Sequence, residues 1–447
     1  SGSPHRSSME DDAGDNMIEP KVLKGFRDSL PSQEIARQKL IGKVQSIFRS
    51  FGFVPIDTPA LEYTEVLLGK GGGETDKQMF RFTDNGGRDV ALRFDLTVPL
   101  ARYVSANYAS LSFPFKRYHI SKVWRGEKPQ KGRFREFIQC DFDIVGADNA
   151  QSDFEILLLI HTCLSQMNVG AFKVSVSHRG LLNRFLATMG LESTCPQVLR
   201  AIDKLSKIGS EGVKQCLRDE GLSEEAIDGI VKFISIEKDD FGKTLSTLED
   251  MFGNCPEMER LKDIYNMMKS CEIDGDFILD TSITRGLDYY TGIVYETLLL
   301  DMPQIGSICS GGRYNNLAGL YTKENLPGVG SCIGLDRLIA ALEELGSPLV
   351  MDSSYADVMV AKTEDDSGWS QKVAMDLRSR GVKTDCYVGE KSMGQQYAYA
   401  QKNGIAYVVT AKDGDRLTAK EIATRKMIEN ITMDELAALA LGSKEER

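Results

Sequence analysis

The chain of 447 residues is too long for one ordinary hydrophobic core, and its average content of hydrophobic (42%) and charged (27%) residues predicts two or three globular domains without a membrane-spanning segment. Nine cysteines without a CxxC pair, and only four histidines, argue against a disulfide framework, a metal centre and a histidine-based catalytic triad, and they favour a cytoplasmic location. The net charge of −11 argues against a nucleic-acid partner unless a local basic patch overrides it.

The N-terminal third of the chain has a helix followed by strand patterns. Residues 1–16 are expected to be an expression scar and a flexible tail. Apolar residues then recur at helical spacing, which predicts a helix over 32–51. Short β-rich runs over 53–146, separated by Gly, Asn and Pro, are typical of an antiparallel sheet. The sequence at 152–155 has the form of a capping box and predicts a helix that begins there.

The rest of the chain suggests an interrupted domain and a separate one. Residues 181–270 carry Lys and Glu at helical spacing without strand alternation, which predicts a helical insertion into a β-rich domain that occupies 17–180 and 271–346. A linker over 347–354 leads to a last domain, 355–447, in which strands alternate with helices. The predicted fold is an α+β domain with a helical insertion, followed by a C-terminal α/β domain.

A concentrated basic segment lies between two predicted strands. Residues 122–135 contain six cations and one acid, despite the negative charge of the whole chain. Arg125 could hold a phosphate through two hydrogen bonds while the other cations meet a polyanion outside the pocket. A solvated hairpin tip explains the same residues equally well, because short basic runs are common.

Three later segments combine glycines with arginines or tyrosines. Arg285–Tyr290 sets an arginine beside two tyrosines, which suits an anion next to a planar polar group. Ser310–Tyr314 and 328–337 carry glycines that allow close ligand approach, without the pattern of a P-loop or a dinucleotide fold. The structural alternatives are a hairpin corner with core tyrosines and glycines that serve packing.

Taken in order, these segments resemble the signature motifs of class II aminoacyl-tRNA synthetases, specifically the histidyl-tRNA synthetases, in a eukaryote-like form. Phe53–Leu61 is similar to motif 1, the dimer element, Arg125–Glu136 to motif 2, and Gly330–Arg337 to motif 3. Arg285–Tyr290 and Ser310–Tyr314 resemble the two blocks peculiar to the histidine enzymes. The resemblance implies a class II antiparallel sheet flanked by helices, a C-terminal anticodon-binding domain and a homodimer.

The resemblance also implies a role for individual residues. Those implied to bind ATP are Arg125, Glu127, Phe137 and Arg337. Those implied to bind histidine are Asp95, Thr97, Gln139, Asp143, Arg285, Tyr290 and Tyr314. Arg285 and Arg125 would be catalytic. The residues that would contact tRNA are Lys128, Lys131 and Arg133. Asp95 and Asp143 stand where bacterial members of the family carry glutamates.

The implied reaction converts histidine and ATP to histidyl-adenylate and then transfers the histidyl group to the 3′ end of histidine tRNA. Mg²⁺ would be carried by the ATP phosphates, without a dedicated metal site in the protein. One alternative is a catalytically inactive histidine-sensing or regulatory paralogue, against which Arg125, Arg285 and Arg337 argue. The other is a class II enzyme for another amino acid. The sequence leaves open whether an organelle shares the enzyme with the cytoplasm.

Overall fold

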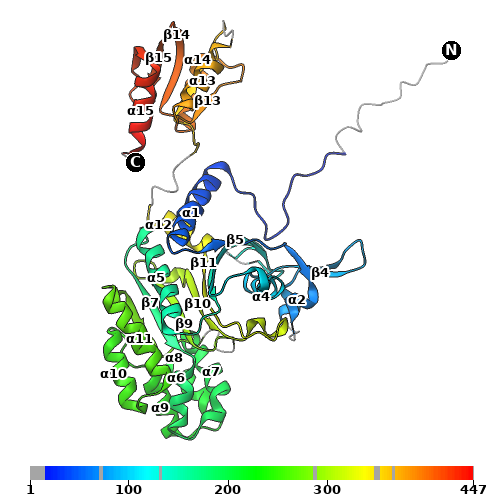
Figure 1. The fold of residues 1–447 in the computed structure, drawn as a ribbon, viewed down its shortest axis with the longest axis vertical. Coiled ribbons are helices and arrows are strands. Elements are labelled where there is room, and N and C mark those ends of the chain that lie inside the picture. The colour runs from blue at the N-terminus through cyan, green and yellow to red at the C-terminus, as the bar shows by residue number, and fades with distance from the viewer. Residues whose placement is uncertain are drawn as a thin grey trace, which may run out of the picture.

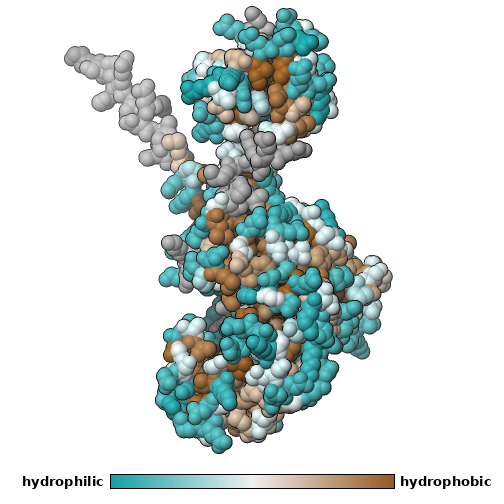
Figure 2. All heavy atoms as spheres, turned by 90° about the vertical axis from the view of Figure 1, so that its left-hand side faces the viewer, coloured by the Kyte–Doolittle hydropathy of each residue, from teal (hydrophilic) through white to brown (hydrophobic). Residues whose placement is uncertain are grey.

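The computed structural model describes residues 16–69, 74–129, 133–284, 289–346, 353–364 and 368–445. Figure 1 shows a large unit that contains most of the elements and a smaller C-terminal unit. Across these ranges, every helix is too short or too polar for a membrane span. Figure 2 shows one face of the molecule, on which hydrophilic residues surround smaller hydrophobic patches.

An eight-stranded sheet forms the centre of the large unit. Its strands are β1 (Val54–Pro55), β5 (Phe115–Trp124), β6 (Glu136–Val145), β7 (Phe172–His178), β8 (Phe277–Leu279), β9 (Ile293–Leu299), β10 (Cys309–Tyr314) and β11 (Gly328–Gly334). They lie in the order β1-β5-β6-β11-β10-β9-β7-β8. The pairs β1–β5 and β7–β8 at the two edges are parallel, and all pairs between them are antiparallel. The antiparallel sheet predicted from the sequence is therefore confirmed.

Three helices contribute to the core against one face of this sheet: α1 (Pro31–Ser50), α5 (Ala150–Gln166) and α12 (Leu335–Glu344). Phe48 of α1 packs against Tyr118 and Phe142, with ring centres 5.3 and 5.0 Å apart. The helix predicted at 32–51 is confirmed. The predicted start of the next helix is wrong, because the side chain of Asn149, not Ser152, caps α5 by accepting a hydrogen bond from the Ser152 backbone N–H.

Smaller elements cover the other face near β5. They are α4 (Thr97–Ala106), α2 (Thr64–Leu68), α3 (Glu74–Gln78) and a three-stranded sheet of β2 (Leu61–Tyr63), β4 (Asp89–Leu92) and β3 (Arg81–Thr83). Leu100 and Val104 of α4 pack with Phe115 and Val145. Short 3-10 helices are η1 (Tyr108–Ser110), η2 (Glu192–Thr194), η3 (Asp274–Asp276), η4 (Pro303–Ile305) and η5 (Leu317–Leu320).

The stretch predicted to be helical lies between β7 and β8. Its helices are α6 (Gly180–Ala187), α7 (Cys195–Asp203), α8 (Leu205–Asp219), α9 (Glu224–Ile234), α10 (Phe241–Phe252) and α11 (Pro256–Ser270), here called the inserted helices. Their buried residues, such as Ile227 and Leu261, belong to the same hydrophobic core as Val174 of β7. The inserted helices therefore share a core with the sheet.

The C-terminal unit has a five-stranded sheet in the order β13-β12-β14-β15-β16. Its elements are β12 (Val358–Val360), α13 (Trp369–Ser379), β13 (Thr384–Cys386), α14 (Met393–Lys402), β14 (Tyr407–Asp413), β15 (Arg416–Glu421), β16 (Met427–Thr432) and α15 (Met433–Glu445). The parallel pairing of β12 with β13 and β14 confirms the predicted βαβ pattern. The antiparallel β15 and β16 were not predicted.

Candidate active site

One face of the large sheet carries charged side chains. Across the β5–β6 ladder, Arg117 stands opposite Asp143 and His119 opposite Asp141. Side chains alternate along a strand, so these four share the face opposite to Phe142. Each of the four is at most 3% exposed. Buried charges are costly unless they are paired, so their concentration here indicates a functional site.

Asp143 is held from two sides. Arg117 Nη2 lies 2.6 Å from Asp143 Oδ1, and the Tyr314 hydroxyl donates a hydrogen bond to Asp143 Oδ2. Burial raises the pKa of Asp143, against the opposing effects of Arg117 and Tyr314. The fixed carboxyl group can accept a hydrogen bond from an N–H group of a ligand.

A small cavity of about 50 Å³ lies against Asp143. Residues that line it include Thr97, Asp141, Asp143, Tyr289, Tyr290 and Tyr314. Within the described residues, Asp141 Oδ1 has no hydrogen-bond partner. The cavity therefore brings together four residues predicted to bind histidine and adds a carboxyl group whose hydrogen bonding is incomplete.

The glycines of β10 and β11 make room for the side chains of this site. A Cβ on Gly330 would lie 1.9 Å from Asp143 Oδ2, and one on Gly328 would lie 2.4 Å from the Tyr314 ring. A Cβ on Gly312 would lie 2.8 Å from the Tyr290 ring. These glycines were predicted to allow close ligand approach, whereas in the structure they accommodate protein side chains.

Asp95 and Arg125 lie on neighbouring loops. Asp95 accepts a hydrogen bond of 3.1 Å from the Val98 backbone N–H at the start of α4. Burial raises the pKa of Asp95, and the Val98 N–H and Arg125 oppose the rise. Arg125 Nε donates to the Phe94 carbonyl at 3.2 Å, and its guanidinium carbon lies 5.0 Å from the centre of the Phe137 ring. Arg125 and Phe137 therefore offer a cation and an aromatic face side by side to a ligand.

Gln139 and Arg337 lie near the same end of the two neighbouring strands β6 and β11. Gln139 pairs with Gly334, the last residue of β11, and Arg337 follows in the first turn of α12. Arg337 Nη1 donates to the Ser307 carbonyl at 3.0 Å, and its side chain lines a second cavity of about 520 Å³ together with Arg133. Arg337 and Arg133 thus line a different cavity from that of Asp143.

Comparison with known proteins gives the family. The model described as Histidyl-tRNA synthetase matches residues 25–338, and the one described as Anticodon binding domain matches 357–441. The histidine–tRNA ligase of Treponema denticola is 53% identical over 399 residues, which are 88% of this chain and 89% of that protein. This chain belongs to the histidyl-tRNA synthetase family. The resemblance of its motifs is thereby confirmed at the level of the family.

Solved structures agree with the membership. The histidyl-tRNA synthetase from Nostoc sp. PCC 7120 has a TM-score of 0.85 and 31% identity, over 96% of this chain and 100% of that one. A Bacillus halodurans C protein described as an ATP phosphoribosyltransferase regulatory subunit/histidyl-tRNA synthetase has a TM-score of 0.73, over 86% of this chain and 97% of that one. At 20% identity, the second likeness concerns the fold alone. The class II fold with a C-terminal anticodon-binding domain is confirmed.

Two of the residues that the resemblance to histidyl-tRNA synthetases selected, Arg285 and Lys131, lie outside the described residues. Glu127 and Lys128 are exposed beyond the end of β5. The backbone carbonyl of Glu127 accepts a hydrogen bond of 2.9 Å from Arg135 Nε.

The partners of the predicted carboxylates were not predicted from the sequence. Arg117 pairs with Asp143, and the pKa of the neighbouring His119 is lowered to about 4 by burial and by Arg117. His119 Nε2 lies 3.2 Å from Asp57 Oδ1. Polar residues at alternate positions of two predicted strands were the available signal, because such residues are rarely buried on a sheet without a ligand or a partner.

Proposed function

We propose that the chain is a histidine–tRNA ligase, which activates histidine with ATP and transfers it to the 3′ end of histidine tRNA. The observation that carries the proposal is the buried carboxyl group of Asp143, fixed by Arg117 and Tyr314 beside a small cavity. It occurs in a chain that is 53% identical to a histidine–tRNA ligase over 88% of its length.

The small cavity is proposed to take the imidazole ring of histidine. Asp143 would accept the hydrogen bond of a ring N–H, and Tyr290 and Tyr314 would enclose the ring. The α-ammonium group would face Asp95, with Thr97 and Gln139 as additional polar partners, because a buried ammonium needs a carboxylate nearby. The shorter side chains of Asp95 and Asp143, where the family also has glutamates, leave space for the substrate or a bridging water.

The second substrate is proposed to bind beside the first. Arg125 would hold the α-phosphate of ATP, and Phe137 and Arg337 would enclose the adenine, with Glu127 at its edge. Arg285 would stabilise the negative charge that shifts between the histidine carboxylate and the α-phosphate in the transition state. Mg²⁺ would bind mainly to phosphate oxygens and water.

The remaining proposals concern the tRNA contacts, the homodimer and the cellular location. Lys128, Lys131 and Arg133 would contact the tRNA phosphates. A homodimer through the motif 1 region is supported by the exposure of Val54 and Leu61, at 48% and 43%, which is high for apolar side chains in strands. We also propose a cytoplasmic, eukaryote-like enzyme whose sharing with an organelle stays open.

We propose that each domain predicted from the sequence has its own function. Residues 17–180 and 271–346 would carry catalysis, 181–270 would be the helical insertion and 355–447 would bind the anticodon, after the tail at 1–16 and the linker at 347–354. The match of an anticodon-binding model to residues 357–441 favours a ligase over a regulatory paralogue, because a regulatory paralogue does not need to bind a tRNA anticodon.

Exchange of labelled pyrophosphate into ATP tests this function. The protein should catalyse the exchange with histidine, and not with threonine, proline or glycine, the substrates of related class II enzymes. It should then load histidine onto histidine tRNA. A protein that binds histidine but shows neither reaction would instead be the regulatory paralogue.

A further inference from the structure

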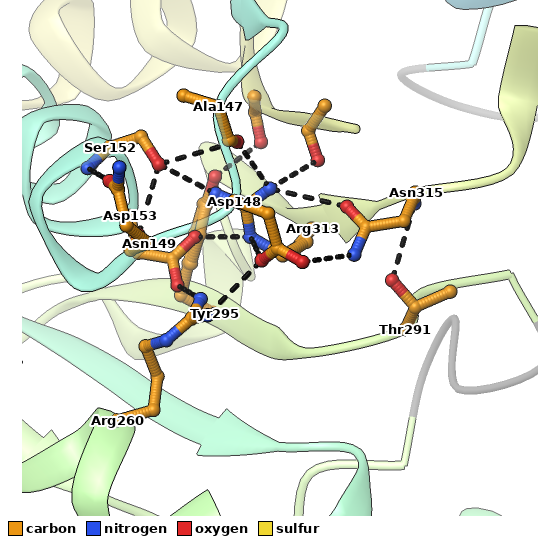
Figure 3. A network of polar contacts seen from close by, with 12 residues as sticks. Ala147, Asp148, Asn149, Ser152, Asp153, Arg260, Thr291, Tyr295, Arg313 and Asn315 are labelled. Atoms are coloured by element: carbon orange, nitrogen blue, oxygen red, sulfur yellow. Dashed lines mark hydrogen bonds and ion pairs between the residues drawn. The ribbon is translucent and has the colours of Figure 1, made fainter. Parts of the chain in front are cut away.

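Two neighbouring residues of β10 serve opposite faces of the sheet. Tyr314 reaches Asp143 in the small cavity, whereas Arg313 points away from that cavity and is 2% exposed. Figure 3 shows Arg313 at the centre of a polar network. The pocket and this network are therefore connected through a single peptide bond.

Arg313 is bound at three of its nitrogens by the first turn of α5 and by the loop before it. Its Nε donates to Asp153 Oδ1 at 2.8 Å and its Nη2 to Ser152 Oγ at 2.7 Å. Its Nη1 donates to the Ala147 carbonyl at 2.8 Å. The Asp153 side chain is completely buried, so its negative charge needs a paired cation such as Arg313.

The inserted helices complete the network through Arg260 of α11. Arg260 Nη1 lies 2.8 Å from Asp153 Oδ2, and Arg260 Nη2 lies 3.1 Å from Asp148 Oδ1. Asp148 Oδ1 is also 3.4 Å from Arg313 Nε. Each of the two aspartates thus lies between an arginine of the sheet and an arginine of the inserted helices (Figure 3).

The network also reaches Thr291, the residue that follows the pocket residue Tyr290. Asn315 Nδ2 donates to Asp148 Oδ2 at 3.0 Å, and the Asn315 backbone N–H donates to Thr291 Oγ1 at 3.2 Å. The Thr291 backbone N–H in turn donates to the Arg313 carbonyl at 2.8 Å. Thr291 directly follows Tyr290, so one set of contacts holds residues adjacent to Tyr290 and to Tyr314, two of the three tyrosines that line the small cavity.

We propose that Arg260 is a positioning residue for the histidine pocket, acting from the inserted helices through Asp148, Asp153 and Arg313 on Tyr290 and Tyr314. This inference rests on the proposed function, because it assigns histidine to the small cavity. Loss of Arg260 leaves the buried Asp153 with one arginine instead of two, and relaxation of Arg313 and Asn315 then shifts the two tyrosines. ATP binds beside Arg125, outside this network.

The test is the Michaelis constant for each substrate in pyrophosphate exchange by the full-length Arg260→Gln protein. We expect the KM for histidine to rise about five- to tenfold while the KM for ATP stays within twofold. Arg218→Gln is the matched control, because it breaks the 2.6 Å pair of Arg218 with Glu224 within the inserted helices. Its KM for histidine should equal that of the parent. An unchanged KM for histidine in Arg260→Gln, or an equal loss for both substrates, would overturn the proposal.

Three further measurements keep the outcome clear. If Arg260→Gln does not fold, Arg260→Lys keeps the charge but cannot bridge both aspartates, and it should show a smaller rise of the same KM. The KM for histidine should also rise in Asp148→Asn. In the double variant Asp148→Asn/Arg260→Gln, the free-energy change that corresponds to the rise should be smaller than the sum of those of the two single variants, and full additivity would contradict the network. Calorimetric titration measures the affinity of the same pocket for histidine without catalysis. A parent that binds histidine but lacks exchange refutes the proposed function alone.

Discussion

Gly330 shows how closely the pocket is packed at the level of single residues. A Cβ at this position would lie 1.9 Å from Asp143 Oδ2 and 2.7 Å from the Phe142 carbonyl oxygen. Neither neighbour can yield easily, because one belongs to the backbone and the other is held by Arg117 and Tyr314. A single methyl group should therefore displace the carboxyl group proposed to recognise histidine.

We expect Gly330→Ala to raise the KM for histidine at least tenfold and to lower the melting temperature, since overpacking costs about 1–3 kcal/mol. Gly42→Ala is the control, because a Cβ there would meet no neighbouring group within 4 Å and alanine suits a helix. Pyrophosphate exchange and thermal unfolding of both variants check the prediction. Normal histidine affinity in Gly330→Ala would show that Asp143 is not the recognising group.

Asp141 makes stability depend on pH. Burial, opposed by Arg117 and assisted by Asp143, raises its pKa from 3.8 to about 7. Between these two values the folded protein retains a proton that the unfolded chain has lost, so the free energy of unfolding falls as pH rises through this window. Asp141→Asn cannot ionise and should remove this part of the fall. Urea unfolding of both proteins from pH 5 to 8 measures it, and parallel curves would contradict the assignment.

The sequence predicted the residues of the pocket better than their partners. Tyr290 and Tyr314 belong to the segments Arg285–Tyr290 and Ser310–Tyr314, and the family resemblance selected Asp143. Arg117 and Asp141 become meaningful only once the pairing of β5 with β6 sets them beside the pocket. A strand pattern gives the face of a side chain relative to its own strand, and the neighbour across the ladder depends on a register that the pattern does not contain.

At the level of elements, residues 24–27 cross the stem of the basic loop. The Gly25 carbonyl accepts a hydrogen bond of 2.8 Å from the Arg135 backbone N–H, and the Arg135 carbonyl accepts one of 2.8 Å from Arg125. The Arg27 guanidinium lies 3.8 Å above the Phe134 ring, and its Nη2 is 2.8 Å from Asp336 Oδ1 in the first turn of α12. This segment thus joins the basic loop to α12, the helix that carries Arg337.

Arg27→Ala should loosen both sides of the proposed ATP site. The stacking contact and the exposed ion pair contribute about 0.5–1 kcal/mol each, so we expect the KM for ATP to rise about two- to tenfold. Arg27→Lys keeps the charge without the planar stacking group, so its KM for ATP should lie between those of the parent and Arg27→Ala. Steady-state exchange kinetics measure the effect. An unchanged KM for ATP in Arg27→Ala would mean that the segment has no part in ATP binding.

Apolar periodicity predicted α1, whereas the capping residue of α5 and the added strands of the C-terminal sheet were missed. The apolar spacing of α1 sufficed for that helix. Ser152 matched the capping pattern, yet its side chain is buried and donates to backbone carbonyls, while Asn149 caps the helix. The antiparallel β15 and β16 extend a sheet whose predicted part is parallel, and that addition depends on tertiary pairing rather than on a local signal.

For the whole molecule, the two units have separate hydrophobic cores. The described core of the large unit ends with Leu342, and that of the C-terminal unit begins with Val358. A chain that ends at residue 346 should therefore fold and keep histidine-dependent pyrophosphate exchange while losing most of its loading of tRNA, since the match to an anticodon-binding model lies beyond it. Loss of exchange in a folded protein of this length would show that the C-terminal unit takes part in activation.

The strand order of the large sheet has a consequence for how the protein is made. β6 ends at Val145, but its second neighbour, β11, begins only at Gly328. Until the ribosome has synthesised all of the intervening chain, the edge of β6 has no partner, and exposed edges pair readily with other chains. Nascent chains of this protein are therefore vulnerable to aggregation throughout the synthesis of residues 146–327, and spontaneous renaturation from denaturant is expected to be slow.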